Sequence, residues 1–510
     1  MGVAISLTLR RQAAAGCAIR LLRRRDGGGG GLIFSYAAPY AARMGNTVPG
    51  EGRSPFDPPI DQLVELGGEA VHFAARFVED RYTAPNADMG DLEELLGLLG
   101  ASPPSSGRSF QDLLELVGLA AAKGFDPANP GFMAYIPGGG LYASALGDFL
   151  ACVVNRYTGL ARPAPAMVQL EQSVLRWLCD LFGLPSSAQG LLTPGGSMST
   201  FAALVAARGS RLGEHFLDGA LYVSDEAHHS VAKAAKIAGF PADAVRVVPA
   251  DEALRFDPEA LGEAVRRDRA AGRRPFLVVA SAGTINAGMV DPLDAMADVA
   301  ERENLWLHVD AAYGGFFQLT DRGRAALRGI ERADTVTLDP HKGLFLPYGT
   351  GCLLARDGAT LRAAHDVAAH YLPDVTDGLP DFAAYGPELT RDFRGLRIWL
   401  PLHLHGTQAF RDALDEKLDL AYYLHQHLDA LPELEVPWRP DLSLVAFRPR
   451  GGTDAECLQL LDRIHDSGRV WLSSAPIRGR LFLRACILSH RSRSERVEEL
   501  AAIVQDAVAA

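Results

Sequence analysis

Apolar residues recur every three or four positions through the first long patterned part of the chain, from Pro58 to about Lys123. Leucines keep this spacing in "DLEELLGLLG" and "FQDLLELVGLAAAKG", and both stretches end at a glycine. A period near 3.6 residues with a glycine at its end is typical of amphipathic helices. We therefore predict a helical N-terminal segment over residues 44–125.

From about Pro127 to Asp357 the pattern changes to short apolar runs that alternate with helical stretches. The apolar runs are "GALYVSD", "FLVVASAGT", "LWLHVD", "DTVTLD" and "GTGCLLAR", and the helical stretches include "SVAKAAKIAG" and "DPLDAMADVAEREN". Strands that alternate with helices form βαβ units on a mostly parallel sheet. The pattern predicts a large α/β domain over residues 126–360.

A polar, proline-containing stretch from His370 to Pro387 separates this domain from the last part of the chain. Helical patterns follow in "LRIWLPLHLHG" and "FRDALDEKLDLAYYLHQHL", then short strands in "LSLVAFRPR" and "RLFLRACIL", then a last helix. We predict that residues 361–510 form a loop and a small C-terminal α+β domain.

The first 43 residues have a different composition. They contain seven arginines and one acid, Asp26, which is followed by the glycine run Gly27–Gly31. A transit peptide, or a lipoprotein signal around Cys17, are alternatives, but Arg10 and Arg11 interrupt the apolar stretch that such a signal needs. We expect residues 1–43 to be a disordered extension.

Charge and cysteine content narrow the classes of function. The 510 residues include 50 basic and 62 acidic side chains, a net charge of −12, which argues against nucleic-acid or anionic-membrane partners. No apolar run is long enough for a membrane helix. The six cysteines are far apart and form no CxxC pair, so we expect neither a disulfide framework nor a structural zinc site, and a cytoplasmic location.

Four polar side chains follow predicted strands of the central domain. His228 follows "ALYVSDEA", Thr284 follows "FLVVASAG", Asp310 ends "LWLHVD" and Lys342 follows "TVTLDPH". The carboxyl ends of parallel strands meet at one edge of a sheet, where open α/β sheets bind ligands. We expect these four side chains to share one crevice.

A fifth feature is the stretch "TPGGSMSTFAALVAARG". Gly195 and Gly196 allow close approach of backbone, and residues 197–199 begin a helix whose free amides suit a phosphate. A lysine amine, a phosphate cradle and a carboxylate are the groups that pyridoxal phosphate needs for its aldehyde, its phosphate and its ring nitrogen. Pyridoxal phosphate is therefore the predicted cofactor, with no metal.

Two other classes of enzyme fit parts of the pattern. His308 and Asp310 lie two residues apart, as do Asp339 and His341, and such pairs occur in two-metal hydrolases. A nicotinamide-dependent enzyme is the other alternative. Against it, "GGSMST" lacks the G-x-G-x-x-G order of that fold.

The order of the motifs resembles that of the group II pyridoxal-phosphate-dependent amino-acid decarboxylases, the family of aromatic-L-amino-acid decarboxylase. The resemblance runs from about Asn129 to Gln505 and is carried by "NPGFMAYIPGGG", "APAMVQLEQSVLRWL", "TPGGSMSTFAAL", "SDEAHHSVAKAA", "ASAGTINAGMVDPL", "WLHVDAAYGG", "LDPHKG", "RDFRGLRIW" and "FLRACIL". It implies a fold-type I large domain with a mostly parallel seven-stranded sheet, and a homodimer with the active site at its interface.

The resemblance also implies roles for individual residues. Lys342 corresponds to the Schiff-base lysine, His228 to the histidine that stacks on the cofactor ring, and Asp310 to the partner of the ring nitrogen. Further cofactor contacts are implied for Ala312 under the ring, Thr284 in the ring pocket, Ser197, Met198 and Ser199 in the phosphate turn, and His341 before the lysine.

Two departures from the family pattern bear on activity. Asp339 occupies a position where animal members have asparagine, and a carboxylate there would repel the phosphate. The catalytic loop of many members carries a tyrosine that supplies a proton, and "AAHYLPD" offers Tyr371 for it, with Tyr385 as the alternative.

The implied reaction is decarboxylation of an L-amino acid to an amine and carbon dioxide. Tyr135, Ile136, Pro137 and Tyr157 correspond to substrate-pocket positions of the aromatic branch, and apolar or aromatic walls favour an aromatic substrate. An aldehyde synthase, in which oxygen intercepts the reaction before the proton arrives, is the alternative with the same cofactor. A protein that binds the cofactor without catalysis is the third hypothesis, which the intact lysine, aspartate and histidine disfavour.

Overall fold

The computed structural model describes residue 54 and residues 56–90, 92–366 and 378–509, together with the backbone of two paired strands, β1 (Ile19–Leu22) and β2 (Ile33–Tyr36). The chain divides into one unit up to Gly68 and a second unit from Glu69 to Ala510. Apart from β1 and β2, the predicted disordered extension over residues 1–43 lies outside the described residues and stays a prediction.

The residues before the large sheet are mainly helical. They form α1 (Ile60–Asp80), α2 (Leu92–Leu99), α3 (Phe110–Ala121), α4 (Tyr142–Val154) and α5 (Pro165–Leu181), with a two-stranded ladder of β3 (Ala87–Asp88) and β4 (Gly124–Phe125). The Ser109 side chain accepts from the backbone N–H of Asp112 and caps the start of α3. Asn155 ends α4 in the left-handed region, which asparagine adopts more readily than most residues.

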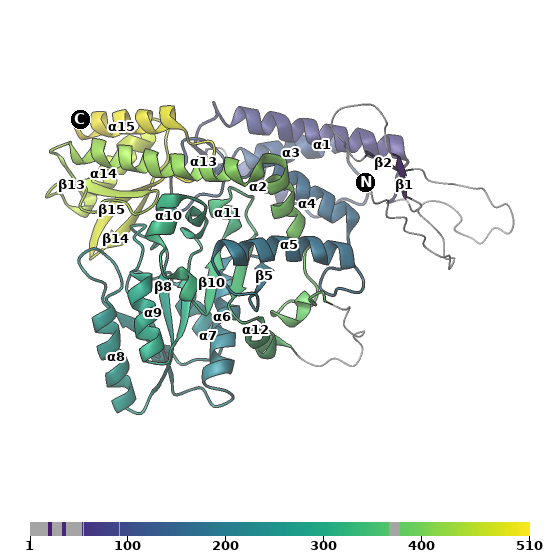
Figure 1. Ribbon diagram of the computed structural model, residues 1–510. Coiled ribbons are helices and arrows are strands. Elements are labelled where there is room, and N and C mark those ends of the chain that lie inside the picture. The colour runs from purple at the N-terminus through teal and green to yellow at the C-terminus, as the bar shows by residue number, and fades with distance from the viewer. Residues whose placement is uncertain are drawn as a thin grey trace, which may run out of the picture. The chain divides into compact units, whose positions relative to one another are not determined.

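A seven-stranded sheet forms the centre of the second unit. Its strands are β5 (Gln189–Thr193), β6 (Gly219–Ser224), β7 (Val245–Val248), β8 (Arg274–Ser281), β9 (Trp306–Asp310), β10 (Thr335–Leu338) and β11 (Gly351–Ala355). Their spatial order is β5-β11-β10-β9-β8-β6-β7, and every pairing is parallel except those of β11. The predicted mostly parallel α/β sheet is confirmed (Figure 1).

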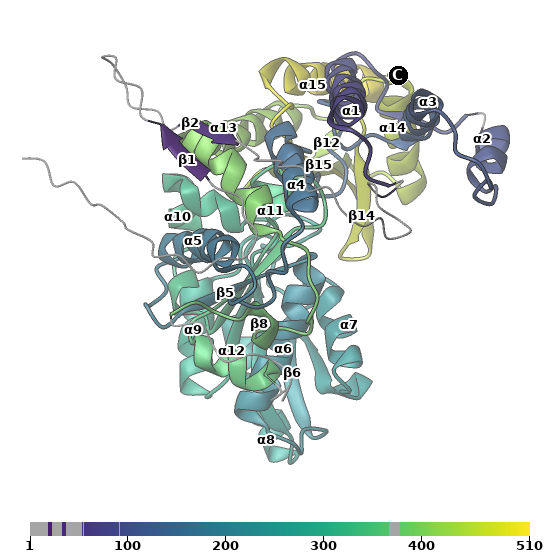
Figure 2. The same ribbon diagram turned by 90° about the vertical axis from the view of Figure 1, so that its right-hand side faces the viewer.

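Helices cover both faces of this sheet. Apolar side chains of α5, α8 (Pro258–Ala270) and α9 (Leu293–Arg302) share a core with one face, and those of α6 (Gly196–Arg211), α7 (Ser230–Ile237) and α12 (Gly358–His365) share a core with the other. Figure 2 shows α9 and α7 on opposite sides of the sheet. Because both faces are buried, the strands are apolar runs without alternation.

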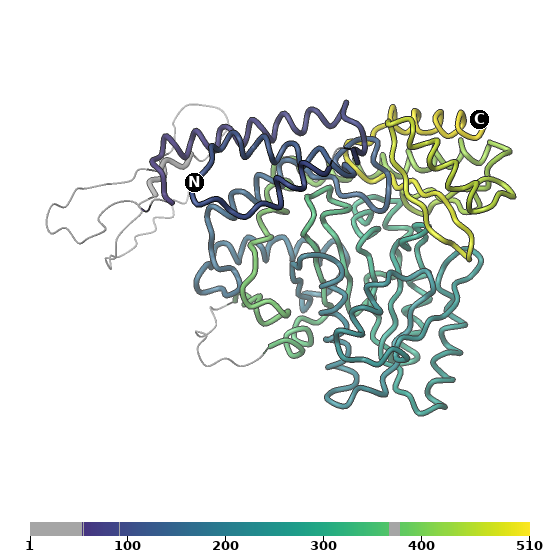
Figure 3. The backbone as a smooth tube through the Cα atoms, turned by 180° about the vertical axis from the view of Figure 1, so that it is seen from behind, coloured from purple at the N-terminus to yellow at the C-terminus, as the bar shows by residue number. Residues whose placement is uncertain are grey.

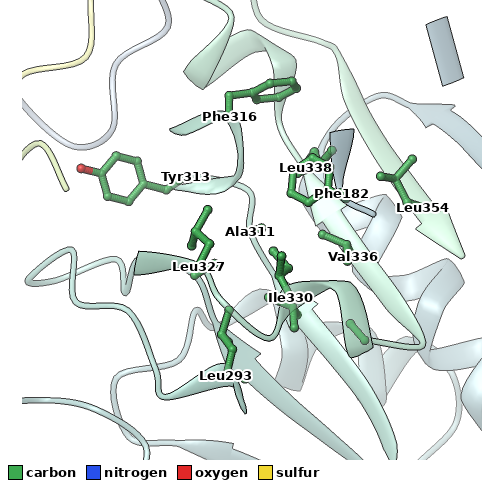
Figure 4. Packing of buried hydrophobic residues seen from close by; sticks show 14 of the residues in the cluster. Phe182, Leu293, Ala311, Tyr313, Phe316, Leu327, Ile330, Val336, Leu338 and Leu354 are labelled. Atoms are coloured by element: carbon green, nitrogen blue, oxygen red, sulfur yellow. The ribbon is translucent and has the colours of Figure 1, made fainter. Parts of the chain in front are cut away.

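Tight packing fixes the ends of the central strands. Val336 and Leu338 of β10 are fully buried in a cluster with Phe182, Phe316 and Leu354 (Figure 4). Truncating such a side chain to alanine typically costs about 2–5 kcal/mol. The carboxyl end of β10, which leads to Lys342, is therefore held in place by this packing.

The C-terminal domain is a four-stranded antiparallel sheet with helices on it. Its elements are α13 (Gly395–Asp429), β12 (Leu434–Glu435), β13 (Leu444–Pro449), α14 (Asp454–Asp466), β14 (Ser473–Ile477), β15 (Arg480–Cys486) and α15 (Ser494–Ala509). Figure 3 follows the backbone from the green of α13 into the yellow of this domain. Gly406, at φ 77°, interrupts the helical geometry of α13, and the chain bends there. The predicted small α+β domain is confirmed.

Helices that could cross a membrane are absent from the part of the chain that the structure describes.

Candidate active site

One cavity of about 460 Å³ lies where the strands of the large sheet end. The ends of β8 and β9 and the segments that follow β5, β6, β8, β9 and β10 contribute to its wall. The residues expected from the sequence that line it are Ile136, Ser197, Met198, His228, Asp310, Ala312, His341 and Lys342. Segments from six parts of the chain thus meet at one site, as the parallel-sheet argument requires.

Lys342 belongs to a single helical turn, α11 (Pro340–Gly343), that directly follows β10. Pro340 begins the turn, where its missing N–H costs nothing. The Lys342 Nζ atom lies 2.9 Å from Oδ2 of Asp339. A Cβ atom on Gly343 would lie 2.6 Å from the Cβ of Phe316, so only glycine fits behind the lysine. The lysine is held at the strand end by packing on one side and by an ion pair on the other.

His341 has a defined tautomer. Its Nδ1 lies 2.6 Å from the carbonyl oxygen of Thr350, which can only accept, so Nδ1 carries the hydrogen. Its Nε2 lies 3.6 Å from Oδ2 of Asp339. Burial lowers the pKa of His341. Arg397 donates from Nη1 to the carbonyl oxygen of Gly349 and to the Thr350 hydroxyl, and thereby fixes the turn that orients the imidazole.

Asp310 and His228 face the cavity from β9 and from the loop after β6. One carboxylate oxygen of Asp310 accepts from the backbone N–H of Ala312 at 3.1 Å. The Nδ1 atom of His228 accepts from the backbone N–H of Ser230 at 3.2 Å, so its neutral ring carries the hydrogen on Nε2. Burial lowers the pKa of His228, although the nearby Asp310 opposes the effect. The ring is therefore neutral at neutral pH.

The start of α6 provides a cradle for an anion. Gly195 precedes the helix and no side chain caps it, which leaves the first backbone N–H groups for a ligand. A Cβ atom on Gly351 would lie 2.5 Å from the carbonyl carbon of Gly195, so β11 and the cradle pack closely. Ser199 is buried and its hydroxyl pairs with that of Thr193 at 2.8 Å, which places it behind the wall formed by Ser197 and Met198.

Several residues predicted for the site lie away from the cavity wall. The Thr284 hydroxyl accepts from the backbone N–H of Met289, while its neighbours in sequence line the cavity. The Tyr157 hydroxyl donates to the carbonyl oxygen of Leu389 at 3.0 Å. Tyr135 is 56% exposed, and Pro137 is buried outside the wall. Tyr371 lies outside the described residues, and Tyr385 is half-buried away from the wall.

Tyr313 and Ile285 line the cavity and were missed as site residues. The Tyr313 hydroxyl lies 2.9 Å from that of Ser443 and accepts from the Ser443 backbone N–H. Tyr313 follows the end of β9 by three residues, so its place in sequence was a usable signal. Its partner lies 130 positions further along the chain, and nothing in the sequence pairs the two.

The part of the chain that the structure describes contains no metal site of the kind that the two-metal hydrolase alternative requires. His308 is buried beneath the sheet edge, with its ring nitrogens 2.9 Å and 3.3 Å from the hydroxyls of Thr335 and Thr337. Burial lowers its pKa to about 4. No group of three or more potential ligands is assembled among the described residues.

The donor set suits pyridoxal phosphate. Lys342 can form the covalent link, the Asp310 carboxylate can pair with a protonated ring nitrogen, and the uncapped start of α6 can hold the phosphate. His228, neutral and flat-sided, can lie against the ring. Ala312 leaves room on the wall for a planar group.

Comparison with known proteins agrees with this chemistry. The model of the pyridoxal-dependent decarboxylase conserved domain matches residues 93–450. Over 451 residues the chain is 32% identical to aromatic-L-amino-acid decarboxylase of Bacillus atrophaeus, which covers 86% of this chain and 94% of that protein. Phenylacetaldehyde synthase of Arabidopsis thaliana is 28% identical, over 88% of this chain and 96% of that protein.

Among solved structures, Oryza sativa TDC with PLP and tryptamine superposes with a TM-score of 0.84 at 26% identity, covering 90% of this chain and 99% of that one. The region matched by the family, residues 93–450, includes every residue that lines the cavity. The chain therefore belongs to the pyridoxal-dependent decarboxylase family and is a decarboxylase that uses pyridoxal phosphate.

Proposed function

We propose that this enzyme removes the α-carboxylate of an aromatic L-amino acid and releases the corresponding amine and carbon dioxide. One observation carries the choice of substrate. The charged residues of the cavity wall are Lys342, Asp310 and Asp339, and its large apolar or aromatic side chains include Ile136, Ile285 and Tyr313. Apart from histidine, Lys342 is the only basic residue among the described residues of the wall. An acidic substrate side chain would have no cation to pair with, whereas an aromatic ring would find apolar contacts.

The names of relatives support the same choice. The relative from Bacillus atrophaeus is named an aromatic-L-amino-acid decarboxylase. The Oryza sativa protein was crystallised with tryptamine, which is an aromatic amine. The synthase from Arabidopsis thaliana favours oxidative formation of an aldehyde as the second candidate.

The proposed mechanism assigns a task to each side chain. When bound, pyridoxal phosphate supplies a ring that accepts the electrons left by loss of carbon dioxide. Asp310 keeps positive charge on the ring nitrogen, and this electrostatic contribution is the largest that the protein makes. Lys342 would hold the cofactor covalently between turnovers. His228 would lie against one face of the ring and, being neutral, would add no charge to it.

Delivery of the proton to Cα decides between amine and aldehyde. We assign this step to Tyr371, with Tyr385 as the alternative. If the proton arrives promptly the product is the amine. If it does not, oxygen reacts first and the products are an aldehyde, ammonia and hydrogen peroxide.

Homodimerisation is part of the proposal. The second half of α4 presents Phe149, Leu150, Val153 and Val154, all more than a third exposed. An apolar helix face of this kind marks a protein interface. Light scattering on the purified protein tests it: we expect twice the mass of the chain. The five cysteines within the described residues are all free, which supports the reducing cytoplasm as the compartment.

A screen of the twenty amino acids for release of carbon dioxide tests the substrate. We expect tryptophan, tyrosine or phenylalanine to give the highest kcat/KM and glutamate to give none above background. Amine, aldehyde and peroxide are then measured in the same reaction. Preference for glutamate would refute the aromatic assignment, and aldehyde as the main product would favour the synthase.

A further inference from the structure

A carboxylate lies in the corner of the cavity that the fold prepares for an anion. Asp339 follows β10, its side chain is 5% exposed, and it lines the cavity beside Gly195 and Gly196. A Cβ atom on Gly196, the first residue of α6, would lie 3.1 Å from Oδ2 and 3.3 Å from Oδ1 of Asp339. The acid thus borders the same helix start that suits the phosphate of the cofactor.

The two oxygens of this carboxylate have unequal surroundings. Oδ2 lies 2.9 Å from Nζ of Lys342 and 3.6 Å from Nε2 of His341. Oδ1 is buried and has no hydrogen-bond partner among the described residues. A buried carboxylate oxygen without a donor is unfavourable, so a ligand that brings a hydrogen to Oδ1 would be stabilised.

Other ionisable groups face Asp339 from each neighbouring element. They are Lys342 and His341 on α11, His228 after β6, Asp310 on β9 and Cys352 on β11. Burial lowers the pKa of both histidines and raises that of the Cys352 thiol, so these three are neutral at neutral pH. Lys342 is the cation that balances Asp339.

Binding of the cofactor changes that balance. The Lys342 nitrogen bonds to the aldehyde carbon and the aldehyde oxygen leaves as water, so Lys342 carries at most the one positive charge that it had before. At the same time the phosphate brings about −1.5 to −2 charges at pH 7 to the adjoining helix start. Two anions would then face each other in a buried corner.

We propose that, because of Asp339, the site binds pyridoxal phosphate together with one proton. This proton is shared between Oδ1 of Asp339 and the phosphate. The shared proton gives Oδ1 its missing hydrogen bond and removes one negative charge from the corner. Asp339 is therefore a positioning residue that sets the charge state of the bound phosphate. This inference concerns the cofactor and does not depend on which amino acid is the substrate.

The test compares pyridoxal phosphate with pyridoxal, which has the aldehyde but no phosphate. Both are titrated into the cofactor-free parent and into Asp339→Asn, at pH 8 and pH 6, with the visible absorbance of the bound cofactor as the signal. Both ligands react with Lys342 through the same aldehyde. The affinity for pyridoxal phosphate divided by that for pyridoxal therefore cancels any effect of the substitution on the reactivity of Lys342. At pH 8 we expect this ratio to rise about tenfold in Asp339→Asn. The gain should shrink toward pH 6, where the phosphate itself becomes protonated.

Asp334→Asn is the matched control. Asp334 precedes β10, at the opposite end of the strand from Asp339, where it accepts from the backbone N–H of Leu307 at 2.8 Å. It does not line the cavity. Its replacement removes the same charge from the same strand and should leave the ratio unchanged.

Calorimetry of the parent provides a second test that needs no variant. Binding heats in two buffers of different ionisation enthalpy give the protons taken up, and we expect pyridoxal phosphate to take up close to one more proton than pyridoxal at pH 8. Equal uptake, or a ratio that falls in Asp339→Asn, would overturn the inference. A failed substrate screen would leave both measurements unaffected, so the two proposals fail separately.

Discussion

Arg391 donates from Nη2 to Oε1 of Glu171 at 2.6 Å, and the two side chains are 1% and 0% exposed. The same nitrogen also donates to the carbonyl oxygen of Leu192, one residue before the end of β5. The pair therefore connects helix α5 and the segment before α13 to the strand that leads into the phosphate turn.

Removing one member of this pair should be costly. Glu171→Ala leaves the Arg391 guanidinium buried without its counter-charge, and we expect the free energy of unfolding to fall by about 3–5 kcal/mol. Urea denaturation followed by circular dichroism measures it. Asp180→Ala is the control on the same helix, because Asp180 pairs with Arg176 at the surface and its loss should cost less than about 1 kcal/mol. Equal losses in the two variants would contradict the prediction.

Lys342 should carry the cofactor. We expect the loaded protein to be yellow and borohydride to fix the cofactor irreversibly on the peptide that contains Lys342. Peptide mass spectrometry locates the modification. Lys342→Ala should bind the cofactor without becoming labelled. A label on any other lysine would remove Lys342 from its role.

Asp310→Asn should separate binding from catalysis. The substitution preserves shape but removes the charge that keeps the ring nitrogen protonated. Turnover should fall by about a hundredfold or more, while cofactor affinity changes little, because the phosphate is held elsewhere. Single-turnover kinetics and a cofactor titration measure the two quantities. Undiminished turnover would make Asp310 a structural residue at a strand end.

Tyr371→Phe should change the product. Without the phenol the proton arrives late and oxygen competes, so aldehyde, ammonia and peroxide should rise at the expense of amine. Tyr385→Phe is made in parallel and should leave the product ratio as in the parent. If only Tyr385→Phe shifts the ratio, the proton donor is Tyr385.

His308 should make the protein sensitive to acid. Its pKa is lowered to about 4 by burial, against 6.5 for an exposed histidine. Between these values the unfolded chain binds a proton that the folded chain does not, so stability falls as the pH falls, by up to about 1.4 kcal/mol per pH unit. His308→Gln should show a shallower decline between pH 6.5 and pH 4 in urea denaturation. Burial raises the pKa of Asp291 to about 7, so this residue changes the pH dependence of stability in the opposite direction. Its contribution is the same in the parent and in His308→Gln and cancels when the two are compared. Parallel declines would contradict the assignment.

Parallel strands explain why much of the site could be predicted from the sequence. The strands in "WLHVD" and "TVTLD" are parallel, so their carboxyl ends lie on the same side of the sheet. The residue that follows each strand can therefore be placed without knowledge of the rest of the chain. His228, Asp310 and Lys342 lie at one cavity for this reason.

Residues that lie further along the loops, away from the end of a strand, were harder to place. Thr284 follows Gly283, whose φ of 103° turns the chain, and the Thr284 hydroxyl consequently points back to the backbone of Met289. Tyr157 lies on an irregular segment, where its contact with Leu389 depends on chain more than two hundred residues away. Such contacts are set by tertiary packing, which has no period in the sequence.

The antiparallel course of β11 has a consequence for engineering this enzyme. Because β10 and β11 pair with each other and Lys342 lies on the connection between them, residues 339–351 are secured at both ends, and Gly343 and Gly351 have no room for a side chain. Libraries that aim at a new substrate should leave this segment intact. Diversity is better introduced at Ile136 and Ile285, which line the cavity outside this segment.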